Sequence, residues 1–97
     1  MEQPTIAEIE RVSQIFKVLS DMTRLKIVLS LKSGERNVTS IAEAVDMEQS
    51  AVSHQLKLLR ENNVVKSRRE GKTILYSLDD HHVLDVLDQT FQHIRHL

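Results

Sequence analysis

The chain has 97 residues, 40% of them apolar, and no cysteine, so it has room for one small domain (residues 1–97) and excludes disulfides, thiolate metal ligands and a cysteine nucleophile. A domain of this size gains buried surface by pairing with a second copy, so a homodimer is expected; the lack of a long apolar run or a basic N-terminal segment predicts a cytoplasmic chain with no membrane partner. The formal net charge of -1 by itself argues against a nucleic-acid binder.

Two helices are predicted at the start of the chain. Thr5 and Glu8 form a capping box ahead of apolar residues at helical spacing, which predicts a first helix over residues 5–19. Asp21 is expected to cap a second helix, which ends at Ser33-Gly34.

A tightly joined pair of helices is predicted next. After a polar loop over residues 35–38, Thr39 is expected to cap a short helix. A further helical pattern begins after only a few polar residues, and its apolar members are Val52, Leu56 and Leu59. Two helices joined this closely are typical of a helix-turn-helix.

The periodicity then changes to that of a β-hairpin. The β-branched runs 64–69 and 73–78 are separated by Glu70-Gly71-Lys72, with glycine where a tight turn needs positive φ. Ser77 or Asp79 is expected to cap a last helix, whose apolar residues lie on more than one face and predict burial against a partner. The predicted fold class is mainly α with a small β-hairpin (α+β): a dimeric chain in which a helix-turn-helix and a two-stranded antiparallel hairpin precede the last helix.

Charge is segregated along the chain. Between Gln49 and Lys72 there are six basic and two acidic residues, whereas from Asp79 to the end four acidic residues accompany one arginine. Such asymmetry indicates two separate binding surfaces, with two differently solvated faces as the alternative.

The second helix of the tight pair and the basic hairpin after it are suited to DNA. An α-helix fits the major groove, where short polar side chains near its N-terminal end can reach base edges; the ordinary alternative is a solvated helix start. Hairpin cations would contact phosphate or the minor groove, adding affinity with little sequence information. Lys57 is either such a contact or a generic surface charge. The candidate DNA-binding residues are Gln49, Ser50, Ser53, His54, Gln55 and Lys57 on the helix and Arg68, Arg69 and Lys72 on the hairpin.

The last helix carries a second group of candidate residues, with metal-binding chemistry. His82 and His93 share nearly the same helical stripe but lie roughly 16 Å apart along the axis, so one helix cannot chelate a metal with both. If two copies of the helix run antiparallel about a two-fold axis, Asp80 and His82 of one copy meet His93 and His96 of the other, at two equivalent sites. Three imidazoles and a carboxylate suit tetrahedral Zn(II), with Co(II) and Ni(II) as alternatives.

Within this group the carboxylate fits least well. Asp80 lies about 200° from His82 on an ideal helical wheel, so it must sit at the edge of the helix, and the neighbouring His81 is a competitor that points about 100° away. The ordinary alternative is that all these residues are caps and surface groups of a polar helix.

Two motifs carry a resemblance to a known family. Residues 50–60 (SAVSHQLKLLR), with 68–72 (RREGK) and 76–78 (YSL), resemble the recognition helix and wing of the ArsR/SmtB family of metal-responsive winged-helix repressors. The resemblance covers nearly the whole chain, and the pattern Asp-x-His, ten residues, His-x-x-His narrows it to the CzrA-like, zinc- and cobalt-sensing branch. It implies a dimeric winged helix-turn-helix fold, with the two-stranded antiparallel hairpin as the wing. It also implies that Asp80, His82, His93 and His96 are all metal ligands. Glu48 departs from the family, which often places Ser or Thr as the helix cap there.

Together these features predict a metal-sensing transcriptional repressor. Its metal-free dimer would bind a pseudo-palindromic operator, and Zn(II) at the inter-subunit sites would weaken DNA binding and derepress metal efflux or resistance genes. The alternatives are a metal-independent winged-helix regulator and a zinc buffer or chaperone. An enzyme is not expected, because four protein ligands would close the metal site and no second constellation of nucleophile and base is present.

Overall fold

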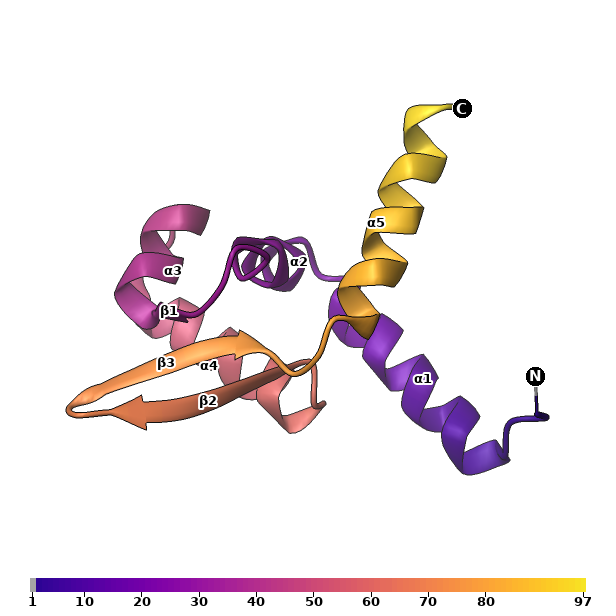
Figure 1. Ribbon diagram of the computed structural model, residues 1–97, viewed down its shortest axis with the longest axis horizontal. Helices are drawn as coiled ribbons and strands as arrows, with labels where there is room; N and C mark the ends of the chain where they lie inside the picture. Colours follow the sequence, from indigo (N-terminus) through magenta and orange to yellow (C-terminus); the bar gives the residue numbers. More distant parts are fainter. Residues whose placement is uncertain (1) are drawn as a thin grey trace.

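A computed structural model describes residues 2–97. Figure 1 shows the second, third and fourth helices grouped beside a long hairpin whose tip points away from the first and last helices. The elements in chain order are α1 (Ile6–Leu19), α2 (Met22–Ser30), β1 (Arg36–Asn37), α3 (Val38–Val45), α4 (Gln49–Glu61), β2 (Val65–Glu70), β3 (Thr73–Leu78) and α5 (His82–Arg95).

The first two helices begin where the sequence predicts. The Thr5 hydroxyl accepts from the Glu8 backbone N–H at 3.1 Å, and the Glu8 carboxylate accepts from the Thr5 N–H at 2.9 Å, which confirms the capping box. Asp21 caps α2 by accepting from the Arg24 N–H. These caps satisfy backbone donors that the first helical turn leaves unpaired.

A single apolar core joins α2, α3 and α4 to the base of the hairpin. Burial of the apolar side chains in this core is the main favourable contribution to the free energy of folding. The side chains with no exposed surface include the three apolar members of the α4 pattern, which fixes the opposite side of α4 toward solvent. They are Ile27, Val28, Ile41, Val52, Leu56 and Leu59.

The helix-turn-helix is confirmed, with one change at its start. Asn37, not Thr39, caps α3, because its side chain accepts from the Ser40 N–H at 2.8 Å. The helix ends at Val45, its C-cap Asp46 adopts a left-handed φ of 57°, and the Met47 N–H donates to the Ala42 carbonyl at 3.0 Å. This turn places α4 directly after α3. Glu48 precedes α4 and makes no side-chain capping bond.

The wing, defined here as β2, the turn at Gly71 and β3, belongs to a sheet of three strands rather than two. Part of the predicted polar loop, Arg36–Asn37, pairs antiparallel with β3 as β1, and the strand order is β1-β3-β2. Two polar residues carry no alternating apolar pattern, so the sequence gives no sign of this strand. Gly71 has φ of 62°, as the predicted turn requires.

The last helix starts later than predicted. Neither Ser77 nor Asp79 caps it: α5 begins at His82 after the N-cap His81, whose side chain makes no capping bond. None of its residues is buried, and α1 likewise exposes an apolar row. Within residues 2–97 no helix is long and apolar enough to cross a membrane.

Candidate nucleic-acid interface and metal centre

The N-terminal half of α4 presents the predicted polar side chains to solvent. Val52, Leu56 and Leu59 hold the helix against the core, so the residues between them face outward. A convex helix with short polar groups at its start matches the shape of the major groove. The exposed residues are Gln49, Ser50, Ser53, His54 and Lys57.

A groove of about 370 Å³ connects α4 to the wing. Ser53 of α4 and Lys72 at the wing turn, two candidates that lie 19 positions apart in the sequence, both line it. Thr39 from the first turn of α3 and Tyr76 of β3 also line it. The sequence prediction did not include these two; the position of Thr39 at a helix N-terminus, where backbone N–H groups attract anions, was the available signal.

Gln55 has a different environment from the other candidates on α4. It is half-buried, and its side-chain oxygen accepts from Arg24 Nη1 at 3.0 Å. Arg24 Nε also donates to the carbonyl of Val18, near the end of α1, at 2.7 Å. One guanidinium therefore ties α4 to α1, and the Gln55 carbonyl is occupied by this contact.

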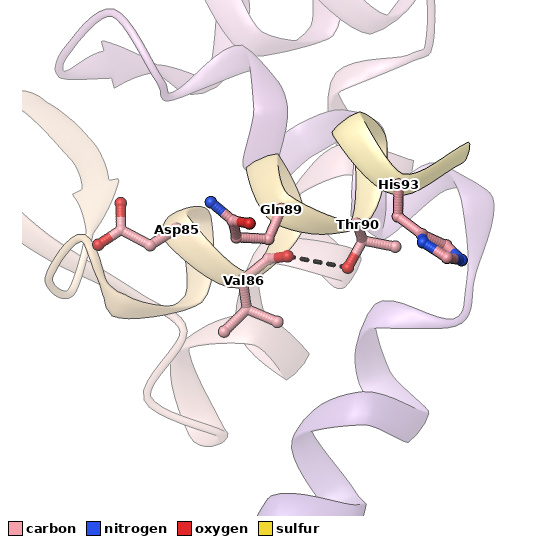
Figure 2. A pocket seen from close by; sticks show the side chains of 5 residues that line it. All are labelled: Asp85, Val86, Gln89, Thr90 and His93. Atoms are coloured by element: carbon pink, nitrogen blue, oxygen red, sulfur yellow. Dashed lines mark hydrogen bonds between the residues drawn. The ribbon is translucent and has the colours of Figure 1, made fainter. Parts of the chain in front are cut away.

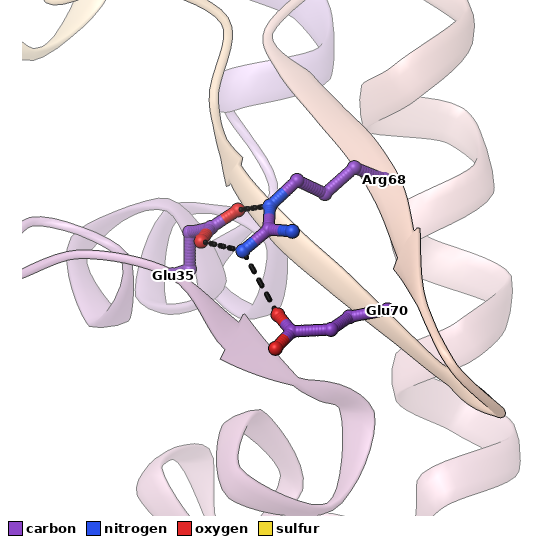
Figure 3. Close-up of polar contacts among 3 residues, drawn as sticks. All are labelled: Glu35, Arg68 and Glu70. Carbon is purple, nitrogen blue, oxygen red and sulfur yellow. Dashed lines mark hydrogen bonds and ion pairs between the residues drawn. The ribbon is translucent and has the colours of Figure 1, made fainter.

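The cations of the wing differ in their surroundings. Arg68 makes two hydrogen bonds to Glu35, at 2.7 and 2.8 Å, and one to Glu70 at 3.0 Å (Figure 3). This pairing raises the pKa of Arg68 and lowers that of Glu35 through the hydrogen bonds and their Coulomb attraction. Arg69 and Lys72 are exposed, and neither has an ion pair within residues 2–97.

Asp80 and His82 lie together at the start of α5. The Asp80 carboxylate accepts from the His82 backbone N–H at 2.8 Å, and the same oxygen is 3.3 Å from His82 Nδ1. The backbone hydrogen bond, followed by the imidazole, lowers the pKa of Asp80 and favours its ionised, ligating form. Because Asp80 precedes the helix, the 200° separation of an ideal wheel does not apply. A tetrahedral zinc ion with bonds of about 2.0 Å separates its ligands by about 3.3 Å, so this pair fits one edge of such a site.

The other two candidate ligands lie at the far end of α5. The His93 and His96 rings pack edge-to-face with centroids 6.4 Å apart. On an ideal helix they share one face with His82, Val86 and Gln89. Within residues 2–97 of one chain no three His, Cys, Asp or Glu side chains come close enough to hold a metal. One chain therefore brings the four candidate ligands together only as two separate pairs.

An open hollow follows this face of α5 between the two pairs. Its volume is about 410 Å³, and Val86, Gln89 and His93 line it (Figure 2). The Thr90 hydroxyl donates to the Val86 carbonyl at 2.8 Å. A shallow apolar channel along a helix accommodates the ridge of another helix.

His81, the competing ligand, points elsewhere. Its Nδ1 atom lies 3.5 Å from the Asp85 carboxylate, one turn along the helix. The adjacent His82 imidazole instead faces Asp80. The geometry of the free chain thus groups His82, not His81, with the candidate carboxylate.

Comparison with known proteins identifies the family. Residues 21–67 match the model described as bacterial regulatory protein, arsR family. The regulator NmtR of Mycobacterium tuberculosis is 45% identical over 87 residues, which cover 90% of this chain and 72% of NmtR. The chain belongs to the ArsR family. A homologue of the cadmium resistance regulatory protein CadC from Staphylococcus aureus is 44% identical, covering 87% of this chain and 70% of the relative.

A solved relative matches the fold. The homodimeric winged helix-turn-helix domain Mb0332 of Mycobacterium bovis has a TM-score of 0.83 and 31% identity, covering all of this chain and 96% of that one. The predicted family and fold class are therefore confirmed, and the chain is a DNA-binding regulator rather than an enzyme.

Proposed function

We propose that this chain is a metal-responsive transcriptional repressor, which acts in the cytoplasm as a homodimer on a pseudo-palindromic operator. The single observation that carries the proposal is the pair of half-sites on α5. Asp80 with His82 and His93 with His96 occupy the two ends of one exposed face. Neither pair is a complete metal site, and a second, antiparallel α5 supplies the missing half.

Two exposed surfaces support the dimer. Ile9, Val12 and Phe16 of α1 are each more than half exposed, and Val86 of α5 is 47% exposed. Apolar rows of this kind on a small domain mark an interface. On this proposal α1 and α5 of both protomers form the dimer contact, and each α4 faces outward toward DNA.

The division of roles among the DNA contacts follows from position. Gln49, Ser50, Ser53 and His54 read base edges from the N-terminal half of α4, because they are exposed on the side of the helix opposite to the core residues Val52 and Leu56. Lys57, Arg69 and Lys72 supply phosphate contacts. Gln55 donates through its remaining amide group while Arg24 holds its carbonyl.

Metal binding is expected to change the affinity for DNA through the relative arrangement of the two protomers. Asp80, His82, His93 and His96 hold the ion, which when bound links one α5 to the other. Metal binding favours the arrangement of protomers that brings the four side chains together. DNA favours the arrangement in which both α4 helices match the two halves of the operator. If these arrangements differ, each ligand weakens the other by the same factor. The donor set fits Zn(II), with Co(II) and Ni(II) as alternatives, and supports the CzrA-like branch.

The test measures DNA affinity by fluorescence anisotropy, with and without zinc, on an operator duplex selected from random sequence by the wild-type protein. Zinc is expected to weaken wild-type binding by roughly 5- to 150-fold. His93→Ala should keep the metal-free affinity and lose the zinc response, while the matched control His81→Ala should respond as the wild type does. Zinc that binds the wild-type protein without changing its DNA affinity would refute the coupling.

The two other functions give distinct results. A metal-independent regulator would bind the duplex and not bind zinc. A zinc buffer would bind the metal and show no preference among duplexes. Ser53→Ala combined with His54→Ala separates the surfaces further: it should abolish operator preference and preserve zinc affinity.

A further inference from the structure

An ion-pair cluster on the sheet connects the wing to the body of the molecule. Arg68 of β2 binds Glu35, which directly precedes β1, through two parallel hydrogen bonds, and it also contacts Glu70. In the strand order β1-β3-β2, β3 lies between the two partners. The pair therefore spans the full width of the sheet, as Figure 3 shows.

The cluster lies on the side of the wing that faces away from α4. Val65 is buried, and Ser67 accepts a hydrogen bond from Arg60 of α4 at 3.3 Å, so these two side chains are on the α4 side. Strand alternation places Arg69 with them and puts Lys66, Arg68 and Glu70 on the opposite side. The register agrees, since Arg68 pairs with Leu75, whereas the groove beside α4 is lined by Ile74 and Tyr76.

We propose that Arg68 is a positioning residue, whose pairing with Glu35 holds the wing in its orientation relative to α4, and that Arg69 and Lys72 make the phosphate contacts of the wing. The inference rests on the proposed binding to DNA, and it differs from the sequence prediction, which groups Arg68 with those cations.

Charge and geometry both favour this assignment. Two carboxylates surround one guanidinium, and with Lys66 on the same side the formal charges cancel, so the cluster presents no net positive charge to attract phosphate. The bidentate pairing with Glu35 also occupies two of the guanidinium N–H donors that Arg68 would otherwise use to bind phosphate. The Arg68 and Glu35 side chains remain 55% and 37% exposed, so they hold the wing without belonging to the core. Because the pair already holds the wing in place in the free protein, less conformational entropy is lost when DNA binds.

The test measures the affinity of the dimer for a short duplex of arbitrary sequence at several salt concentrations. Each phosphate contact adds about 0.9 to the slope of log affinity against log salt, so Arg69→Gln should lower the slope of the dimer by about 1.8. Arg68→Gln and Glu35→Gln should each weaken binding by about 2- to 5-fold with an unchanged slope. These substitutions change the net charge in opposite directions, so a shared loss identifies the pair and not the charge.

Two further variants complete the cycle. The double variant Glu35→Gln with Arg68→Gln should bind no more weakly than either single variant, because the pair is already broken in each. The exchange Glu35→Arg with Arg68→Glu restores the pair at constant net charge and should recover wild-type affinity. Far-UV circular dichroism confirms that each variant folds.

Opposite results overturn the inference. If Arg68→Gln lowers the salt slope as much as Arg69→Gln, Arg68 is a phosphate contact. If Glu35→Gln strengthens binding and steepens the slope, Glu35 competes with DNA for Arg68. A wild-type protein that does not bind the duplex at low salt would instead refute the proposed function itself.

Discussion

Replacing Phe16 with alanine tests whether α1 forms the dimer interface. Phe16 is 54% exposed in the single chain, and together with Val83 and Val86 of α5 it lines an apolar groove of about 180 Å³. A second protomer that covers this groove would remove the remaining exposed surface of the ring from water. The substitution therefore affects the dimer far more than the fold of one protomer.

The size of the effect follows from the exposed surface. A phenylalanine side chain buries about 200 Å² when fully covered, so covering its exposed half removes roughly 100 Å² per protomer. At about 25 cal/mol per Å² this gives about 2.5 kcal/mol, of which alanine retains a small part. Two copies meet in a symmetric dimer, so Phe16→Ala should cost about 4 kcal/mol of association free energy and raise the dimer Kd about 1,000-fold.

Sedimentation equilibrium over a range of concentrations measures this change directly. Ile74→Ala is the matched control, because Ile74 is 41% exposed on the wing, away from α1 and α5, and its loss should leave the dimer Kd unchanged. A Phe16→Ala protein that dimerises as tightly as the wild type would show that the apolar face of α1 is not at the interface.

Three other expectations address separate features. Arg24→Met removes the hydrogen bonds to Val18 and Gln55 and should lower the free energy of unfolding by about 2 kcal/mol, measured by urea denaturation; an unchanged midpoint would show that water replaces both bonds. Because Arg68 lowers the pKa of Glu35, their pair stabilises the fold above the ordinary pKa of glutamate and loses this effect as pH falls through the lowered value. The stability difference between wild type and Glu35→Gln should therefore shrink as the pH falls below the ordinary pKa of glutamate, and thermal unfolding that shows a constant difference would contradict the pairing. An imidazole must be neutral to bind a metal, so zinc affinity measured by competition with a chelator should fall in mildly acidic solution; a flat profile between about pH 8 and pH 6 would exclude a site with three histidines.

Local signals in the sequence were sufficient for most of the fold. The capping box at Thr5, the spacing of Val52, Leu56 and Leu59, and Gly71 at a hairpin turn each act over a few residues, and the structure contains every one. Such features depend on backbone geometry and helical periodicity, which a single sequence records directly.

Features that depend on distant partners were not predictable. β1 has only two polar residues and exists because Arg36 and Asn37 pair with β3, nearly forty residues later. The sequence also gives no indication that Arg68 meets Glu35 or that Gln55 meets Arg24, since each pair is more than thirty positions apart. Strand alternation puts Arg68 and Arg69 on opposite sides of the wing, but only the contact with Glu35 shows that Arg68 is the paired residue.

The contacts within one protomer also limit the ways in which metal binding at α5 can change the binding of DNA. Arg24 joins α1 to α4, and the core fixes α4 against α2 and α3, so a protomer carries its recognition helix as part of one body. On the proposed function, the metal links the α5 helices of two such bodies, and the response is a change in the angle between protomers. The two α4 helices must enter major grooves about 34 Å apart, and a rigid rotation changes that spacing without unfolding either helix. Breaking the Arg24 contacts should accordingly weaken the zinc response and leave zinc affinity intact.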